Sequence, residues 1–258
     1  MKLYFRYFGI HLRSVMQYKL SFFLTTVGQF LVSFTAFLGM YFMFSRFHSV
    51  NGFTYYEILL SFSVILLSFS LAECFVRGFD AFSTTISNGE FDRIMLRPKN
   101  EMFQVLASKI EFSRIGRILQ AIATLVYAIT MIHLFWTPDK IITLLFMIIG
   151  GFVMFSSLFI LYAAFCFFTT EGLEFMNIFT DGGREFGGYP MSVYVKKILK
   201  FCTFIIPIAL VQYYPLLYLL GKSNNVFYII APLSSVIFFL PCYAFWKCGV
   251  RHYKSTGS

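Results

Sequence analysis

Charged side chains are scarce in this sequence. They make up 13% of its 258 residues, whereas an ordinary soluble domain carries roughly 25%. Apolar residues make up 58%, and the mean hydropathy is +0.73. The 36 Phe and 16 Tyr residues suit lipid-facing and interfacial surfaces. The shortage of charge excludes an ordinary soluble domain, and the composition predicts an integral membrane protein.

Cysteine and histidine are also few, and neither is spaced for chemistry. The Cys residues lie in or beside apolar runs, without the spacing of a disulfide framework or a metal site. The His residues lie far apart, and none belongs to an HExxH pattern. We therefore expect no metal centre, and no visible nucleophile–base set supports an intramembrane protease or acyltransferase. The residues concerned are Cys74, Cys166, Cys202, Cys242, Cys248, His11, His48, His133 and His252.

Two glycine-containing stretches match nucleotide-binding loops only in part. Gly221-Lys222-Ser223 looks like the end of a phosphate-binding loop, but Leu216 stands where that loop needs a glycine. The stretch Gly182–Gly188 follows no predicted strand and opens no βαβ unit. We interpret the first as a polar turn and the second as a flexible connector, so we expect no nucleotide site or cofactor on this chain.

Six apolar stretches are near or above the roughly 20 residues that a helix needs to cross a bilayer. Before them, Lys2, Arg6, Arg13 and Gln17 share one helical face, so residues 1–19 are predicted to form an amphipathic helix in the headgroup plane. We predict an all-α polytopic membrane protein in which this helix precedes a six-span domain over residues 20–258. The expected spans cover about residues 20–44, 58–76, 118–136, 141–168, 198–220 and 226–246.

Lysine and arginine predict how these spans are oriented. With the N-terminus in the cytoplasm, all of the 21 basic residues except Arg46, Lys140 and Lys222 fall in cytoplasmic segments. These segments account for the net charge of +9, so no nucleic-acid partner is needed to explain it. We expect both termini in the cytoplasm. The basic N-terminus leads into a long span with no small-residue cleavage site, so we expect no cleaved signal peptide.

The stretch 198–220 is the least regular of the six. Pro207 and Pro215 each lack a backbone donor, and Gln212 lies between them. In lipid, the carbonyls that lose their donors need another partner or a water-lined cavity. A kinked span and a broken helix that re-enters the membrane from outside both fit this pattern. The segment before it, Thr169–Val195, is Gly-rich and charged, and we expect it to be too polar to span.

Three charged residues stand near the end of the second span. Glu73, Arg77 and Asp80 are spaced so that one helix would bring them to the same face. Ionisable residues at membrane depth are candidates for function. Pairing of Glu73 with Arg77 offers a purely structural explanation. Both a structural salt bridge and a role in gating therefore remain open.

The loop between the second and third spans, about residues 77–114, is the largest polar part of the chain. A short helix is predicted to end near Asn88-Gly89, because glycine permits a left-handed cap. Pro98 stops any helix that precedes it. Between these points, apolar side chains are framed by charge, which is a pattern that fits docking into a partner's groove. The residues are Glu90, Phe91, Asp92, Arg93, Ile94, Leu96 and Arg97.

Three stretches together carry a resemblance to a known family. The first is Asn88-Gly89-Glu90-Phe91-Asp92 followed by Leu96-Arg97-Pro98. The second begins with Gly183-Arg184-Glu185-Phe186-Gly187 and Tyr189-Pro190, and continues through Pro207 and Tyr214-Pro215 to Leu220-Gly221. The third combines Trp246, Gly249 and Tyr253 with residues 255–258. Over essentially its whole length, the chain resembles the six-span permease subunits of type-2 ABC exporters in a bacterial branch described only as a transport system.

This resemblance implies a division of labour between chains. A separate pair of ATP-binding subunits would bind ATP and Mg²⁺, and would dock on the span 2–3 loop, which is called the coupling helix in the family. The N-terminal helix would flank that contact. The implied docking residues are Gly89, Glu90, Phe91, Asp92, Arg93, Leu96, Arg97 and Pro98.

The resemblance also implies an outer gate and a second permease. Pro207, Gln212 and Pro215 would belong to the gate on the outer side. The partner permease would be a paralogous chain or a second copy of this one, in the bacterial cytoplasmic membrane. Aromatic walls would suit amphipathic cargo, with candidate lining residues Gln29, Phe34, Phe37, Tyr41, Phe62 and Phe69.

An ion-coupled secondary transporter or a channel is the main alternative function. Transporters of that kind often show paired broken helices in two repeated halves. This sequence shows one broken stretch and no evident internal repeat. The resemblance therefore favours the non-catalytic permease of an ATP-driven exporter.

Overall fold

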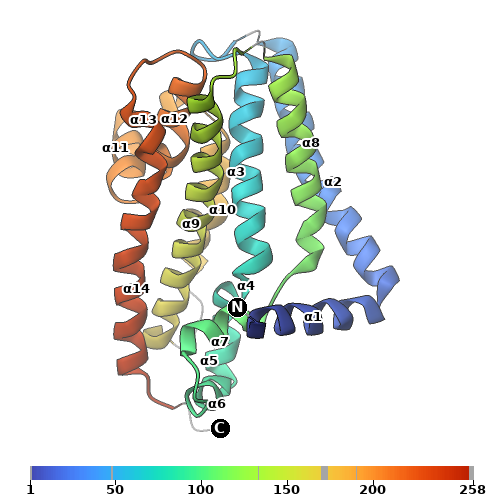
Figure 1. Ribbon diagram of the computed structural model, residues 1–258, viewed down its shortest axis with the longest axis vertical. Helices are drawn as coiled ribbons and strands as arrows, with labels where there is room; N and C mark the ends of the chain where they lie inside the picture. Colours follow the sequence, from blue (N-terminus) through green and yellow to red (C-terminus); the bar gives the residue numbers. More distant parts are fainter. Residues whose placement is uncertain (1, 48, 133, 170–173, 190, 256–258) are drawn as a thin grey trace.

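The computed structural model describes residues 2–47, 49–132, 134–169, 174–189 and 191–255. His48, His133, Pro190 and residues 256–258, which the sequence analysis considered, lie outside these ranges. Within them the chain is built from helices, apart from one isolated β-bridge between Val50 and Phe53. Most of the helices run along one long axis, whereas the first lies across it (Figure 1).

Within the described residues, five helices are long and apolar enough to cross a membrane, which confirms an all-α polytopic membrane protein. The first, second and fourth of the six predicted spans lie close to their predicted positions. The third ends earlier than predicted, at Met131, because Ile132 is extended and starts the connection to α9. The five are α2 (Lys19–Arg46), α3 (Tyr55–Phe75), α8 (Ile115–Met131, preceded by η1, Phe112–Arg114), α9 (Pro138–Thr169) and α14 (Ser234–His252, preceded by α13, Phe227–Ile230, and η5, Ala231–Leu233).

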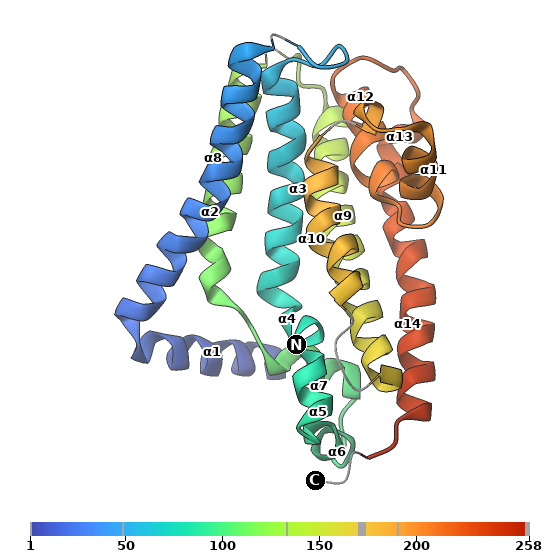
Figure 2. The same cartoon turned by 180° about the vertical axis from the view of Figure 1, so that it is seen from behind.

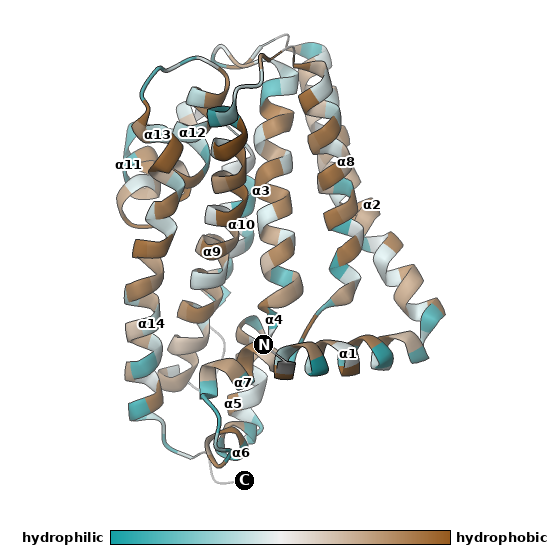
Figure 3. Cartoon of the chain, in the orientation of Figure 1, coloured by the Kyte–Doolittle hydropathy of each residue, from teal (hydrophilic) through white to brown (hydrophobic). Residues whose placement is uncertain are grey.

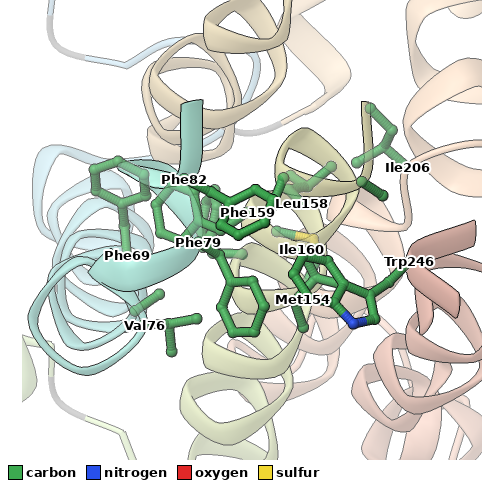
Figure 4. Packing of buried hydrophobic residues seen from close by; sticks show 14 of the residues in the cluster. Phe69, Val76, Phe79, Phe82, Met154, Leu158, Phe159, Ile160, Ile206 and Trp246 are labelled. Carbon is green, nitrogen blue, oxygen red and sulfur yellow. The ribbon is translucent and has the colours of Figure 1, made fainter. Parts of the chain in front are cut away.

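Helix α3 is the centre of the bundle. It is apolar on all sides, and α2, α8, α9 and α10 pack around it. Its start is fixed by a capping box, in which the Glu57 carboxylate accepts the Thr54 amide at 2.8 Å. Below its middle, the ring of Phe69 packs against Phe155 of α9. Figure 4 shows this core continuing to Trp246 of α14.

Helix α1 (Lys2–Gln17) meets the bundle at the end that also carries α4 to α7. We call this the α6 end, and call the opposite end, with the α2–α3 connection at residues 47–54, the loop end. The ring of Tyr4 lies against Phe103, and that of Phe8 against Phe112. The His11 Nε2 atom is 3.1 Å from the Ala107 carbonyl oxygen. The predicted N-terminal helix is thus present, and Tyr18 separates it from α2.

The stretch 198–220 does not form one straight span. It contains α11 (Lys196–Phe204), the π-helical segment η4 (Ala209–Tyr213) and α12 (Tyr214–Leu219), with a bend of 91° between α11 and the η4–α12 pair. Pro207 stands at this break. The Ser192 carbonyl before α11 accepts a hydrogen bond from Asn51 at 3.0 Å, and Lys222 after α12 donates to the Gly52 carbonyl at 2.8 Å. We call residues 196–219 the re-entrant hairpin. Both of its ends therefore lie at the loop end, as in the re-entrant interpretation.

Helix α10 (Asn177–Gly188) corrects the expectation that Gly182–Gly188 is a flexible connector. With 12 residues it is shorter than the roughly 20 that a span needs, but it packs inside the bundle. It runs along α3 toward the loop end (Figure 2). A Cβ atom on Gly187 would lie 2.9 Å from the Ile65 side chain, and one on Gly183 would lie 3.7 Å from the Phe155 ring. Buried small residues therefore let a polar helix approach the core closely, which hydropathy alone does not reveal.

The placement of α11 also changes the distribution of basic residues. Lys196, Lys197 and Lys200 stand on this helix, beside α12 and α13 toward the loop end, and not in a segment at the α6 end (Figure 1). Most other basic residues still lie at the α6 end. Helix α1 and the end of α14 lie there too. The two ends of the described chain thus share one side of the bundle.

Helices α2 and α8 should be sensitive to one added methyl group. A Cβ on Gly116 would lie 2.2 Å from the Thr26 carbonyl oxygen, whereas one on Gly28, in the same part of α2, would meet nothing within 4 Å. We expect Gly116→Ala to destabilise the detergent-solubilised protein by about 1–3 kcal/mol, and Gly28→Ala to be neutral or stabilising by up to ~1 kcal/mol. Thermal unfolding of both variants checks this, and equal melting temperatures would contradict the close α2–α8 contact.

Candidate functional site

The polar loop predicted at residues 77–114 folds into four short helices at the α6 end, followed by η1. They are α4 (Arg77–Asp80), α5 (Phe82–Ser87), α6 (Glu90–Met95) and α7 (Glu101–Ser108). The predicted helix end at Asn88-Gly89 is confirmed, because Gly89 has a φ of +68° between α5 and α6. Helix α6 ends before Pro98, as predicted. We call residues 82–95 the α5–α6 hairpin.

Phe91 lies on the inner side of this hairpin and is 0% exposed. Its ring centroid is 5.4 Å from that of Phe82, 5.1 Å from Phe167 at the end of α9, and 4.9 Å from Tyr253 after α14. The expectation that Phe91 inserts into a partner is therefore corrected. Its ring fixes the hairpin to the ends of α9 and α14, and docking contacts fall to the residues around it.

Polar contacts hold the hairpin and α7 to the end of the chain. The Ser255 hydroxyl donates to Asp92 at 2.5 Å, so Asp92 faces this chain. Lys247 donates to Glu101 of α7 at 2.5 Å. Burial pushes the pKa of Glu101 up, but the hydrogen bond and the charge of Lys247, together with a backbone hydrogen bond, hold that pKa below its ordinary value. The tail after α14 is thus part of the site.

The opposite side of the hairpin is exposed and mixes charge with apolar groups. Leu96 is 86% exposed. Glu90, Arg93 and Arg97 line a groove of about 230 Å³ that Tyr7 of α1 closes on the other side. Ile94 is only partly exposed and also lines this groove. The predicted docking residues that point outward are therefore Glu90, Arg93, Leu96, Arg97 and Pro98.

A second group of charges lies where α3, α4 and α8 meet. The carboxylate of Glu73, 4% exposed, is 2.7 Å from Arg117, 3.2 Å from Arg114 and 3.6 Å from Arg77. Arg77 also pairs with Asp80. Burial raises the pKa of Asp80, and Arg77 opposes that rise. We call these five residues the Glu73 cluster.

The sequence analysis found only part of this cluster. It placed Glu73, Arg77 and Asp80 on one helix, whereas α3 ends at Phe75 and α4 begins at Arg77. It missed Arg114 and Arg117, although their spacing at the start of the third span marks one helical face. Arg114 also donates to Gln29 of α2 at 2.6 Å. The cluster therefore links four segments of the bundle.

A third group of charges lies on α10, in the segment that the sequence analysis interpreted as a flexible connector. Asp181 and Glu185 point away from the core, with side chains 60% and 58% exposed. Arg184 lies between them, 3.7 Å from Asp181 and 2.5 Å from Glu185, with its guanidinium 5.2 Å from the centre of the Phe69 ring. Phe69 belongs to α3, so these charges lie at the depth of the membrane spans.

A groove beside these charges separates α10 from α2. Its volume is about 290 Å³, and its walls include Arg184, Glu185, Ser33 and Thr35. Of the candidate lining residues, Phe62 lies at its floor. Phe69 is a core residue, 1% exposed, and Gln29 is the acceptor for Arg114. Phe34, Phe37 and Tyr41 are exposed or partly exposed on α2.

The residues assigned to an outer gate lie in the re-entrant hairpin. Pro207 stands at its turn, and Pro215 is the second residue of α12, which continues directly from the π-helical η4. The Gln212 amide donates to the Ser61 carbonyl at 2.6 Å and to the Ser61 hydroxyl at 3.1 Å. Gln212 is 2% exposed. It fixes the hairpin to α3 in the half of the bundle nearer the loop end.

Removing the Glu73 carboxylate should be costly. Glu73→Gln leaves buried arginines without their acceptor, for which we expect a loss of about 3–5 kcal/mol in stability. The Glu57–Lys222 pair has the same 2.7 Å separation at the loop end but is more exposed. Glu57→Gln should cost less than about 1 kcal/mol. Thermal unfolding in detergent compares the two, and equal losses would show that burial does not set the strength of the cluster.

The comparisons with known proteins agree with this architecture. A model of the ABC-2 family transporter protein matches residues 30–257. No curated protein and no solved structure matches the chain. The match includes all five long helices apart from the first part of α2, the α5–α6 hairpin, the Glu73 cluster and α10. Membership of this family makes the chain a multi-pass membrane permease component and implies an ATP-binding partner. The protein belongs to the ABC-2 family of transporter proteins.

Proposed function

We propose that this chain is the permease subunit of an ATP-driven exporter, and that a pair of separate ATP-binding subunits docks on the α5–α6 hairpin. ATP and Mg²⁺ bind to those subunits, and this chain contributes no catalytic group or cofactor. Export, as opposed to import, follows the resemblance to type-2 exporters. The membrane is the bacterial cytoplasmic membrane, with both termini and the α6 end in the cytoplasm.

The two-sided construction of the hairpin is the observation that supports this function. Leu96, Arg93 and Arg97 offer an exposed surface to a partner, whereas Phe91 is packed against the ends of two membrane helices. A rigid-body movement of a docked subunit would act on the hairpin first. The ring contacts with Phe167 and Trp246 would then carry it into α9 and α14.

The cargo path is proposed to run along the groove between α2 and α10. Asp181 and Glu185 are more than half exposed at membrane depth. A carboxylate facing hydrocarbon is costly, so charged residues in membrane spans normally face water or protein. A second permease, either a paralogous chain or a second copy, would close this face and leave a water-containing path between the two bundles.

Docking can be tested by reversing one charge. Arg97→Glu changes an exposed arginine on the proposed docking surface, and Arg46→Glu changes an exposed arginine at the loop end. We expect the first to weaken retention of the ATP-binding subunit at least about tenfold, because reversed charge at an interface costs several kcal/mol. The second should retain it normally. Co-purification in mild detergent and ATP hydrolysis measure both, and unchanged retention by Arg97→Glu would remove this surface from the docking site.

The proposed path can be tested by the access of water. In a Cys248→Ser background, which removes the exposed native cysteine, Asp181→Cys is compared with Leu240→Cys. In the isolated chain, the Asp181 side chain is 60% exposed, and Leu240 as a whole residue is 60% exposed. We expect a charged, water-soluble methanethiosulfonate to modify the Asp181 variant at least about tenfold faster, because the reacting thiolate forms in water and not in hydrocarbon. Equal, slow rates in membrane vesicles would place α10 against lipid or a tight interface.

A further inference from the structure

An apolar pocket lies on the other side of the bundle from the α2–α10 groove. Its volume is about 440 Å³, and it opens between α7 and the two long helices α9 and α14. Val76 and Phe79, at the α3–α4 junction, form its inner wall. The side chains around the opening are Met102, Phe103, Leu106, Phe152, Val153 and Phe239.

The position of the pocket determines what surrounds it. Phe152 and Val153 lie near the middle of α9, and Phe239 lies in the middle of the apolar stretch that ends with α14. On the same helical faces, Ile149 and Val236 are 56% and 51% exposed. Figure 3 shows the parts of α9 and α14 above the level of α7 as mainly hydrophobic. This side of the bundle therefore faces hydrocarbon, and water is not its solvent.

The pocket extends from that depth to a polar rim. On α9, the wall extends about 10 Å from Val153 toward the α6 end, as far as Ile160. One leaflet of the hydrocarbon core is roughly 15 Å thick, so the pocket covers much of that depth. At the rim, Asn100 caps the start of α7 by accepting the Phe103 amide at 3.2 Å. A molecule that fills the pocket and reaches this rim must be apolar at one end and polar at the other.

The charges near the rim favour an anion. Lys247 lies beside the rim, paired with Glu101, the residue that follows Asn100. Lys99 is exposed on the other side of Asn100. Two lysines against one carboxylate leave a positive excess, and the first turn of α7 adds the positive end of a helix dipole. Juxtamembrane lysines attract anionic headgroups in this way.

We propose that the pocket holds one acyl chain of an anionic phospholipid from the leaflet that borders α7, with its phosphate near Lys99 and Lys247. The acyl chain fills the space between α7 and the α9–α14 pair, which side chains of this protein leave open. The lipid thus supports α7, which in turn holds the α5–α6 hairpin through Gln104, a donor to the Ile94 carbonyl at 2.9 Å. The pocket shares no lining residue with the exposed docking surface of the hairpin or with the α2–α10 groove.

Native mass spectrometry of the purified chain, titrated with phosphatidylglycerol or phosphatidylcholine, tests the proposal. Val153→Trp fills the pocket, and Val126→Trp places the same side chain on the exposed face of α8 as a control. We expect the unmodified chain and the control to retain one tightly bound phosphatidylglycerol, and Val153→Trp to lose it. Retention of that lipid by Val153→Trp would overturn the proposal.

The headgroup contact has its own test. Replacing Lys99 and Lys247 with Gln should reduce the preference for phosphatidylglycerol over phosphatidylcholine by roughly fivefold for each lysine. An unchanged preference would overturn the assigned phosphate position. Photo-crosslinking of the unmodified chain with an acyl-chain diazirine phosphatidylglycerol avoids any folding defect. Adducts should fall on the peptides around Met102–Leu106 and Phe152–Val153, and adducts only elsewhere would reject the pocket.

Discussion

Burial of Phe91 is the constraint on which the α6 end depends. A six-residue helix has little stability of its own, and α6 is surrounded by charged and exposed residues. Its one fully buried side chain packs edge-on against rings from α5, α9 and the segment after α14. Aromatic contacts of this kind are rigid and directional. The hairpin thus projects from the bundle but is rigidly attached to it. An element that transmits movement from one protein to another needs this rigid attachment.

The Glu73 cluster fixes helix ends in the same way between the hairpin and the long helices. It brings α3, α4 and α8 together through ion pairs, and reaches α2 through Arg114 and Gln29. Buried charges are costly to desolvate, so each depends on its partners. An arrangement with one central carboxylate and several arginines fixes the helix ends more specifically than apolar packing does. Movement of α4 relative to α8 would have to break or exchange these pairs.

The sequence predicted the features that repeat along a helix, and missed those that depend on contact between distant segments. Long apolar runs gave α2, α3 and α9, and Gly89 gave the turn between α5 and α6. The inward direction of Phe91 was not visible, because an aromatic residue in a polar loop looks the same whether it faces a partner or its own chain. Arg117 reaches Glu73 from 44 positions away, and no local spacing encodes that pairing.

Helix α10 shows most clearly why hydropathy misleads here. Its carboxylates lower the average and hide a buried face made of small residues, Thr180, Gly183, Gly187 and Gly188. Small residues bring backbones close in membrane bundles without any large apolar side chain. The same twelve-residue helix can therefore pack tightly against α3 and still present Asp181 and Glu185 on its other face.

Because of this asymmetry, the two sides of the bundle suit different surroundings, one apolar and one polar. The side with α9 and α14 exposes isoleucine, valine and leucine around an apolar pocket. These side chains are stable in contact with lipid hydrocarbon. The side with α2 and α10 exposes carboxylates and hydroxyls at the same depth. Contact of these polar groups with hydrocarbon would be costly. Because α3 lies between the two sides and is buried on all of its faces, it separates them. One helix bundle can thus border lipid on one side and, where a second bundle covers the other, a polar path.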